Sequence, residues 1–172
     1  MCSDLPDVSP DEGSSGTRTW LGLIAFLVVC FAAEAIGGLV TRPSIGTWYA
    51  GLARPAWSPP NGVFAPVWFA LFLLMAIAAW LVWLRRGLRG ARLLFTLFGV
   101  QLALNVLWSV LFFGLHSPAA AFVEILVLWV AIGATVVSFW GARRLAGILL
   151  LPYWAWVTFA AALNLAFWRL NA

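Results

Sequence analysis

Five long runs of apolar residues dominate this chain, and each is long enough to cross a lipid bilayer. A membrane-spanning α-helix needs about 20 mainly apolar residues. The runs cover residues 20–40, 63–84, 93–115, 118–140 and 146–170. They are apolar on every side, unlike an amphipathic surface helix, and they lack the short alternating segments of a membrane β-barrel. We therefore predict an all-α membrane protein that folds as a bundle of five transmembrane helices.

The composition indicates the same class. Of the 172 residues, 64% are hydrophobic and only 9% are charged, and the mean hydropathy is +0.99. Soluble domains carry roughly 25% charged residues, so this chain has too few charges to cover a water-facing surface. The net charge of +4 comes from ten Arg and no Lys. Because these arginines cluster at the ends of the apolar runs rather than along one stripe, we do not expect a nucleic-acid partner.

The N-terminal segment differs from the rest of the chain. Residues 1–17 are polar and acidic and rich in Pro, Ser and Gly, so they have nothing to bury and we predict a disordered tail. Residues 18–172 then form a single membrane domain. Cys2 lies in the tail and Cys30 in an apolar run, so the sequence indicates neither a disulfide framework nor a zinc site.

The connection between the first two apolar runs is much longer than the other three. It spans residues 41–62 and is rich in Pro, Gly and Trp. Long loops in compact domains are usually functional or disordered. Trp48, Tyr49 and Trp57 favour a structured loop that packs on the end of the bundle. A second irregularity is Pro152 inside the fifth run, which predicts either a kink or a helix that starts late.

Arginine placement predicts the orientation in the membrane, because cytoplasmic loops carry an excess of Lys and Arg. One side of the predicted bundle carries Arg18, Arg85, Arg86, Arg89, Arg92, Arg143 and Arg144. The other side carries Arg42, Arg54 and Arg169. This bias places the N-terminus in the cytoplasm, and the long loop and the C-terminus outside. Composition and bias favour an inner membrane, with the outer membrane as the alternative.

Polar and aromatic residues recur at helical spacing within three of the runs. The faces consist of Trp68, Phe72 and Met75 in the second run, Gln101, Asn105 and Trp108 in the third, and Tyr153, Trp156, Ala160 and Asn164 in the fifth. At about 1.5 Å rise per residue, these faces reach similar depths in the outer half of the bilayer. They predict an aromatic pocket with a few amide groups beneath the long loop, suited to a flat, largely apolar ligand. The alternative is that the amides only bond neighbouring helices.

Two carboxylates lie within the apolar runs, Glu34 in the first and Glu124 in the fourth. Their functional roles would be a proton relay or a counter-ion. We favour a simpler interpretation: each is a neutral or Arg-paired carboxyl, or lies close enough to an interface to reach water. Ala33 and Gly37 form a small-xxx-small pair, which predicts close helix contact within the bundle or between protomers.

Familiar catalytic machinery is absent from the sequence. His116 is the sole histidine and has no acidic neighbour, and no phosphate loop, dinucleotide-binding glycine pattern or metal-ligand cluster appears. Catalysis would therefore need tryptophan redox chemistry or a bound photosensitiser. We expect a protein that requires no cofactor and binds no metal.

A series of motifs carries a family resemblance. They are WYAGLARPAWSPPN at residues 48–61, QLALNVLW at 101–108, FFG at 112–114, LPYWAW at 151–156 and LNLAFWR at 163–169. This series resembles the TspO/MBR family of tryptophan-rich sensory proteins, which includes the translocator protein or peripheral benzodiazepine receptor. The resemblance spans residues 20–171, which is all of the chain except the tail.

The resemblance implies a five-helix bundle, usually a homodimer, that binds porphyrins and synthetic aromatic compounds below the first loop. We carry the family's pocket residues over by position and add Gln101, which shares a face with Asn105. The implied ligand-binding residues are Trp48, Trp57, Trp68, Phe72, Gln101, Asn105, Trp108, Trp156 and Ala160. In this arrangement Trp48 helps to hold the loop closed, and a porphyrin or haem-like molecule is a guest rather than a cofactor.

The chain departs from the family pattern at three positions. Phe72 stands where many members have Tyr, so one hydroxyl donor is lost. Leu165 replaces the Tyr at the centre of the proposed cholesterol-contact motif, which argues against cholesterol as a partner. Ala56 stands where some bacterial relatives carry a second Trp, which would weaken stacking on one side of a porphyrin.

The leading functional hypothesis is an integral membrane binding protein for porphyrin-like or other tetrapyrrole-like planar ligands, acting in sensing, scavenging or transport. A second is an enzyme that degrades porphyrin in light and oxygen, with Trp68 and Trp156 as the candidate radical-forming residues. A third is a small-solute or proton-coupled transporter that uses Glu34 and Glu124. The third is the weakest, because five helices give no inverted repeat of the kind that transporters show.

Overall fold

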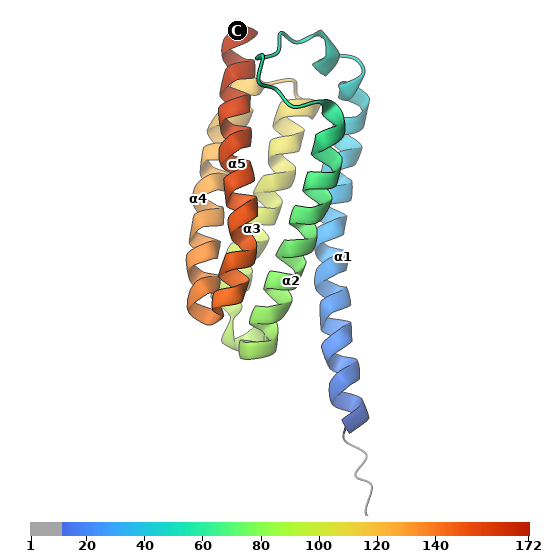
Figure 1. Cartoon of the computed structure of the whole chain (residues 1–172), viewed down its shortest axis with the longest axis vertical. Coiled ribbons are helices and arrows are strands. Elements are labelled where there is room, and N and C mark those ends of the chain that lie inside the picture. The colour runs from blue at the N-terminus through green and yellow to red at the C-terminus, as the bar shows by residue number, and fades with distance from the viewer. Residues whose placement is uncertain (1–11) are drawn as a thin grey trace, which may run out of the picture.

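The computed structural model describes residues 12–172, which form a bundle of long helices that run up and down beside one another (Figure 1). In chain order these are α1 (Glu12–Ile45), α2 (Phe64–Gly90), α3 (Arg92–Ser109), α4 (Pro118–Ala142) and α5 (Arg144–Leu170). A π-helical turn, η3 (Val110–Gly114), extends α3. Over the described residues, five helices are long and apolar enough to cross a membrane, and there is no strand. The predicted all-α, five-helix membrane protein is confirmed.

Helix α1 lies at the edge of the bundle and extends beyond the other helices at the end opposite the loop (Figure 1). It packs on α2, α3 and η3, while α4 packs on both α3 and α5, and α2 packs on α5. Met75, Phe139 and Val157 are among the side chains that are almost completely buried between the helices. Lipid tails are as apolar as these side chains, so close packing and interhelical hydrogen bonds must hold the bundle together.

Glycines permit two close helix contacts. A Cβ added at Gly147 of α5 would lie 2.8 Å from the Cβ of Trp140 in α4 and 2.9 Å from its Cα. A Cβ added at Gly37 of α1 would lie 3.2 Å from the Ser109 hydroxyl of α3. Ala33, one turn earlier on α1, also packs against the core. The small pair Ala33 and Gly37 therefore serves a contact within the bundle.

We expect Gly147→Ala to destabilise the protein, because the added methyl group meets the backbone of Trp140 and can be accommodated only if α4 shifts. Overpacking of this kind costs about 1–3 kcal/mol. Gly141→Ala is the matched control, since a Cβ there meets nothing within 4 Å. Thermal unfolding in detergent should give a lower midpoint for Gly147→Ala alone. Equal midpoints for the two variants would contradict the close α4–α5 contact.

The helix boundaries differ from the predicted ones. α1 begins at Glu12, inside the segment 1–17 predicted to be a tail, and the rest of that segment lies outside the described residues. Helix extension is cheap once a helix exists, because each further residue adds one hydrogen bond. α5 continues from Arg144 through Pro152, so the late helix start predicted at this proline is wrong. Membrane helices tolerate an internal proline where neighbouring helices and local adjustments satisfy the freed carbonyl.

The two arginine-rich turns lie at the same end of the bundle. α2 leaves helical geometry at Gly87, whose φ of 64° is in the left-handed region that glycine adopts readily. Arg86 Nη2 donates to the carbonyl of Gly141 at 3.2 Å, which ties the turn after α2 to the turn after α4. These turns therefore share one side of the bundle, as the arginine count assumed.

The loop between α1 and α2 packs on the opposite end. It contains two short 3-10 turns, η1 (Tyr49–Gly51) and η2 (Asn61–Val63). Tyr49 is buried, and the Arg54 guanidinium lies 4.6 Å from the centre of its ring. At the end of α5, the Asn171 amide accepts from the Ala53 N–H at 2.9 Å and donates to the Ala53 carbonyl at 3.0 Å. The predicted structured loop is confirmed.

Candidate ligand-binding site

A cavity of about 680 Å³ lies beneath the loop, and α1, α2, α3, η3 and α5 all contribute to its lining. Small-molecule sites usually measure about 300–1,000 Å³ and are mostly apolar with a few polar groups. Here the rings are those of Phe31, Tyr49, Phe64, Trp68, Phe72, Trp108, Phe112, Phe113 and Trp156. Such a lining can surround a flat aromatic guest on several sides.

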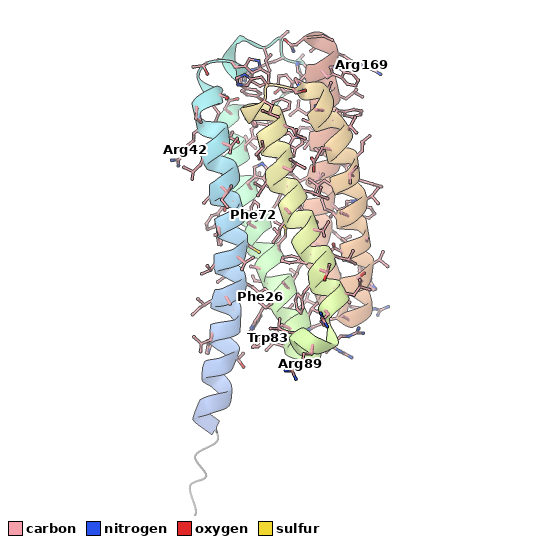
Figure 2. The ribbon with its side chains drawn as sticks, turned by 180° about the vertical axis from the view of Figure 1, so that it is seen from behind. Phe26, Arg42, Phe72, Trp83, Arg89 and Arg169 are labelled. Carbon is pink, nitrogen blue, oxygen red and sulfur yellow. The ribbon has the colours of Figure 1, made fainter. Side chains whose placement is uncertain are left out.

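Most of the predicted binding residues line this cavity. They are Trp68 and Phe72 of α2, Asn105 and Trp108 of α3, and Trp156 and Ala160 of α5. Figure 2 shows Phe72 inside the bundle, at the level where these helices face one another. The faces that helical spacing picked out on three helices therefore meet at one cavity, while ligand binding by these residues stays a prediction.

Three predicted residues lie outside the lining. Trp48 stacks on His116 with 4.4 Å between ring centres, a contact that holds the loop against the turn before α4. Trp57 is 51% exposed, and its ring lies edge-to-face with that of Phe159, with 5.8 Å between ring centres. Gln101 is buried further from the loop, where its Nε2 lies 3.8 Å from the Met75 sulfur. Of the three, Trp48 lies where the loop meets the turn before α4, and its role in holding the loop closed stays a prediction.

The amides in the cavity wall also bond between helices. Asn105 Nδ2 donates to the Tyr153 hydroxyl at 3.1 Å, which joins α3 to α5. Trp108 Nε1 donates to Asn164 Oδ1 at 3.0 Å, and Asn164 Nδ2 donates to the Pro118 carbonyl at 2.8 Å. The interpretation that these amides bond neighbouring helices is therefore observed, because they tie three helices together, while contact with a ligand stays a prediction.

Several polar atoms in the wall remain without a partner among the described residues. The Trp156 indole N–H is buried and donates to no acceptor. Asn105 Oδ1 accepts from no donor, although its Nδ2 is engaged. A buried polar group left unpaired costs about 1–3 kcal/mol. The Asn105 Oδ1 atom is not sealed in this way, so a ligand that donates to it would supply the partner that it lacks.

The π-helical turn η3 shapes the wall nearest the loop. Phe112 stacks on Trp108 with ring centres 5.3 Å apart, and Phe113 lies 5.5 Å from the Tyr49 ring. Ser44 Oγ at the end of α1 donates to the Phe113 carbonyl at 2.7 Å. Consecutive phenylalanines thus both line the cavity. Single π-helical turns inside α-helices frequently mark functional sites, but nothing in the sequence pattern predicted this one.

Sequence reasoning missed the wall that α1 supplies. Glu34, Gly37, Gly38 and Thr41 line the cavity. The spacing of Glu34, Gly37 and Thr41 placed them on one helical face, but the small residues were interpreted as a packing contact alone. A polar stripe beside small residues in a membrane span was the signal that could have identified this wall.

The charged groups near the site have different surroundings. Neither Glu34 nor Glu124 forms an ion pair or hydrogen bond with a described residue, so pairing with arginine is not observed. Glu124 is buried and lies outside the cavity lining. Burial raises the pKa of the Tyr49 phenol, and the Arg54 guanidinium opposes part of that shift, so the phenol is neutral at physiological pH. Within residues 12–172 no cluster of three or more His, Cys, Asp or Glu could hold a metal ion.

Comparison with known proteins decides the family. Residues 26–169 match the model of the TspO/MBR family. The chain belongs to the TspO/MBR family. The resemblance carried by the sequence motifs is therefore confirmed, and the matched segment contains every described residue that lines the cavity.

Relatives of this TspO/MBR protein come from distant organisms. It is similar to the tryptophan-rich protein TspO of Archaeoglobus fulgidus, with 41% identity over 152 residues that cover 88% of this chain and 98% of the relative. It is similar to protein CrtK of Rhodobacter capsulatus, with 41% identity over 150 residues, 85% of this chain and 90% of the relative. The human translocator protein is 40% identical over 154 residues, 88% of this chain and 91% of the relative.

Proposed function

We propose that this TspO/MBR protein binds porphyrin-like planar ligands in the cavity beneath the loop between α1 and α2. The observation that carries the proposal is the convergence of Trp68, Trp108 and Trp156, from three different helices, on one cavity of about 680 Å³. Flat aromatic guests stack on indole rings, and stacking of nucleic-acid bases on aromatic side chains is worth about 1–3 kcal/mol per base. Several such rings around one space favour a large planar ligand over a small solute.

The polar groups of the wall support the same ligand class. Asn105 Oδ1 provides an unpaired acceptor in a lining where aromatic and aliphatic side chains outnumber polar ones such as Glu34 and Thr41. A ligand with a broad apolar surface and few polar atoms matches this ratio. Relatives are named tryptophan-rich sensory protein and translocator protein. We therefore propose that ligand binding serves sensing, scavenging or transport.

Protoporphyrin titration, followed by quenching of tryptophan fluorescence, tests this proposal. We expect saturable binding to the wild-type protein and about tenfold weaker binding to Trp68→Ala, because the variant loses one stacking surface. Trp129→Ala is the matched control, since Trp129 is partly exposed on α4 and does not line the cavity. No saturable binding to the wild type, or an equal loss in both variants, would remove this cavity as the site.

The assembly and the orientation are also proposals. We propose a homodimer in an inner membrane, with the N-terminus in the cytoplasm and the loop between α1 and α2 outside. The family resemblance supports the dimer, and the two arginine-rich turns at one end of the bundle support the orientation. Protease protection of tags placed at the two termini in sealed vesicles would test the orientation, and protected tags at the C-terminus of right-side-out vesicles would contradict it.

A further inference from the structure

Glu34 is a carboxyl group in the cavity wall without a partner. It lines the cavity, is partly buried, and forms no hydrogen bond or ion pair with any described residue. Some polar atoms in the interior lack both a hydrogen-bond partner and contact with solvent. The Glu34 carboxyl oxygens are not among these atoms, so they remain accessible. The group is thus open to a molecule that enters the cavity.

The helical position of Glu34 directs it inward. Cys30 lies one turn before it and is completely buried, and Gly37 lies one turn after it against Ser109 of α3. Spacings of four and three residues put Cys30, Glu34 and Gly37 on the same face of α1. The face of α1 that carries Glu34 is therefore the one turned toward the bundle.

The depth of Glu34 makes an unpaired carboxyl costly. It lies eleven residues before the end of α1 at Ile45, which is about 16 Å along a helix. Placing a charged group at that depth in the bilayer costs free energy. Such groups normally face the bundle interior and mark sites for ions or polar ligands. A positively charged donor would relieve this cost more than a neutral one, because hydrogen bonds to charged groups are the stronger ones.

The tryptophan walls of the cavity also favour positive charge. Arg42 is the other charged residue among the described lining residues and has the opposite charge to Glu34, but it lies eight residues nearer the loop, and Figure 2 shows its side chain directed away from the other helices. The opposite walls carry Trp68, Trp108 and Trp156. The faces of indole rings attract cations, and they do so more strongly when the cation is desolvated.

We propose that the cavity prefers planar aromatic cations, such as protonated nitrogen heterocycles and aryl amines, with Glu34 as the counter-ion. The tryptophan rings stack on the aromatic body, and the Glu34 carboxylate accepts a hydrogen bond from the cationic N–H group. This inference rests on the cavity of the proposed function and adds a charge preference among its planar ligands.

A matched pair of dyes tests the preference. Acridine is neutral at pH 7, whereas 9-aminoacridine, called aminoacridine below, is a cation with the same three-ring framework. Each dye is titrated into protein in phosphatidylcholine nanodiscs, and binding to empty discs is subtracted. We expect the wild-type protein to bind aminoacridine at least about tenfold more tightly than acridine, as a charge-assisted hydrogen bond implies.

Variants of Glu34 test whether this carboxyl causes the preference for the cationic dye. In Glu34→Gln, which keeps the size of the side chain, the ratio of the two affinities should fall to about threefold or less, since an amide forms a weaker bond to the cation. Glu124→Gln is the matched control, because it removes a carboxyl that does not line the cavity, and its ratio should equal that of the wild type. Glu34→Ala is a second variant with the same expected loss.

Protoporphyrin titrated in parallel separates the two proposals. Equal affinities of the wild type for the two dyes, or an unchanged ratio in both Glu34 variants, would overturn the inference about charge. If protoporphyrin still binds in that case, the proposed function stands. If protoporphyrin does not bind the wild-type protein, the proposed function fails whichever dye binds.

Discussion

Replacing Trp156 with alanine should weaken protoporphyrin binding by about 10- to 100-fold, the largest single loss expected in the cavity. Trp156 of α5 lines the cavity, and its ring is supported by Phe64 of α2 at 5.9 Å and by Phe159 at 5.4 Å. The substitution removes a stacking surface that is already held in place, and it removes the unpaired indole N–H. Quenching of the remaining tryptophan fluorescence by protoporphyrin gives the dissociation constant.

Two further variants separate the contributions of Trp156. Trp156→Phe keeps an aromatic ring but offers a smaller stacking surface, so we expect a loss of only about threefold. Trp154→Ala is the matched control on the same helix, since Trp154 stands outside the cavity lining and donates to the Trp129 carbonyl of α4 at 3.1 Å. Similar losses in Trp154→Ala and Trp156→Ala would mean that the effect comes from general disturbance of α5 rather than from the cavity.

Replacing Asn164 with alanine should destabilise the bundle by about 1–3 kcal/mol. Asn164 is 2% exposed and joins three helices, because it accepts from Trp108 of α3 and donates to the Pro118 carbonyl of α4. Alanine removes both hydrogen bonds and leaves the Trp108 N–H without an acceptor among the described residues. For a chain of this length, that loss should lower the midpoint of thermal unfolding by roughly 2–12 °C.

Asn171 provides the control for this prediction. Its side chain also forms amide hydrogen bonds, to the N–H and the carbonyl of Ala53, but it is exposed at the end of α5. Water can replace those bonds in Asn171→Ala, so the unfolding midpoint should change little. Equal shifts in the two variants, measured by circular dichroism in the same detergent, would show that burial of the Asn164 network contributes nothing.

The cavity residues on α2, α3 and α5 could be predicted from the sequence because helical spacing and depth along each helix determine their positions. Helical spacing puts Trp68 with Phe72, Asn105 with Trp108, and Trp156 with Ala160 on single faces. The rise per residue then gives the depth of each pair relative to its span. Neither quantity depends on how the helices are arranged, so the convergence on one cavity could be predicted.

The same reasoning failed where neighbouring helices decide the outcome. Gln101 shares a face with Asn105, yet it lies one turn further from the loop and contacts Met75 instead of the cavity. Trp57 belongs to a loop motif, but the path of the loop leaves it half exposed against Phe159. The position of a loop residue depends on the contacts that both ends of the loop make in the folded protein. The local sequence does not show those contacts.

The number of spans, the packed loop and the family follow from run length, composition and motif order, so the amino-acid order alone was enough to predict them. The packing of the helices was needed to show that α1 supplies a cavity wall with Glu34, and that Phe112 and Phe113 of η3 line the same space. Lipid and protein interior are equally apolar surroundings for a membrane helix. A helix that is apolar all round carries no strong signal of its inward face, so packing against its neighbours selects that face.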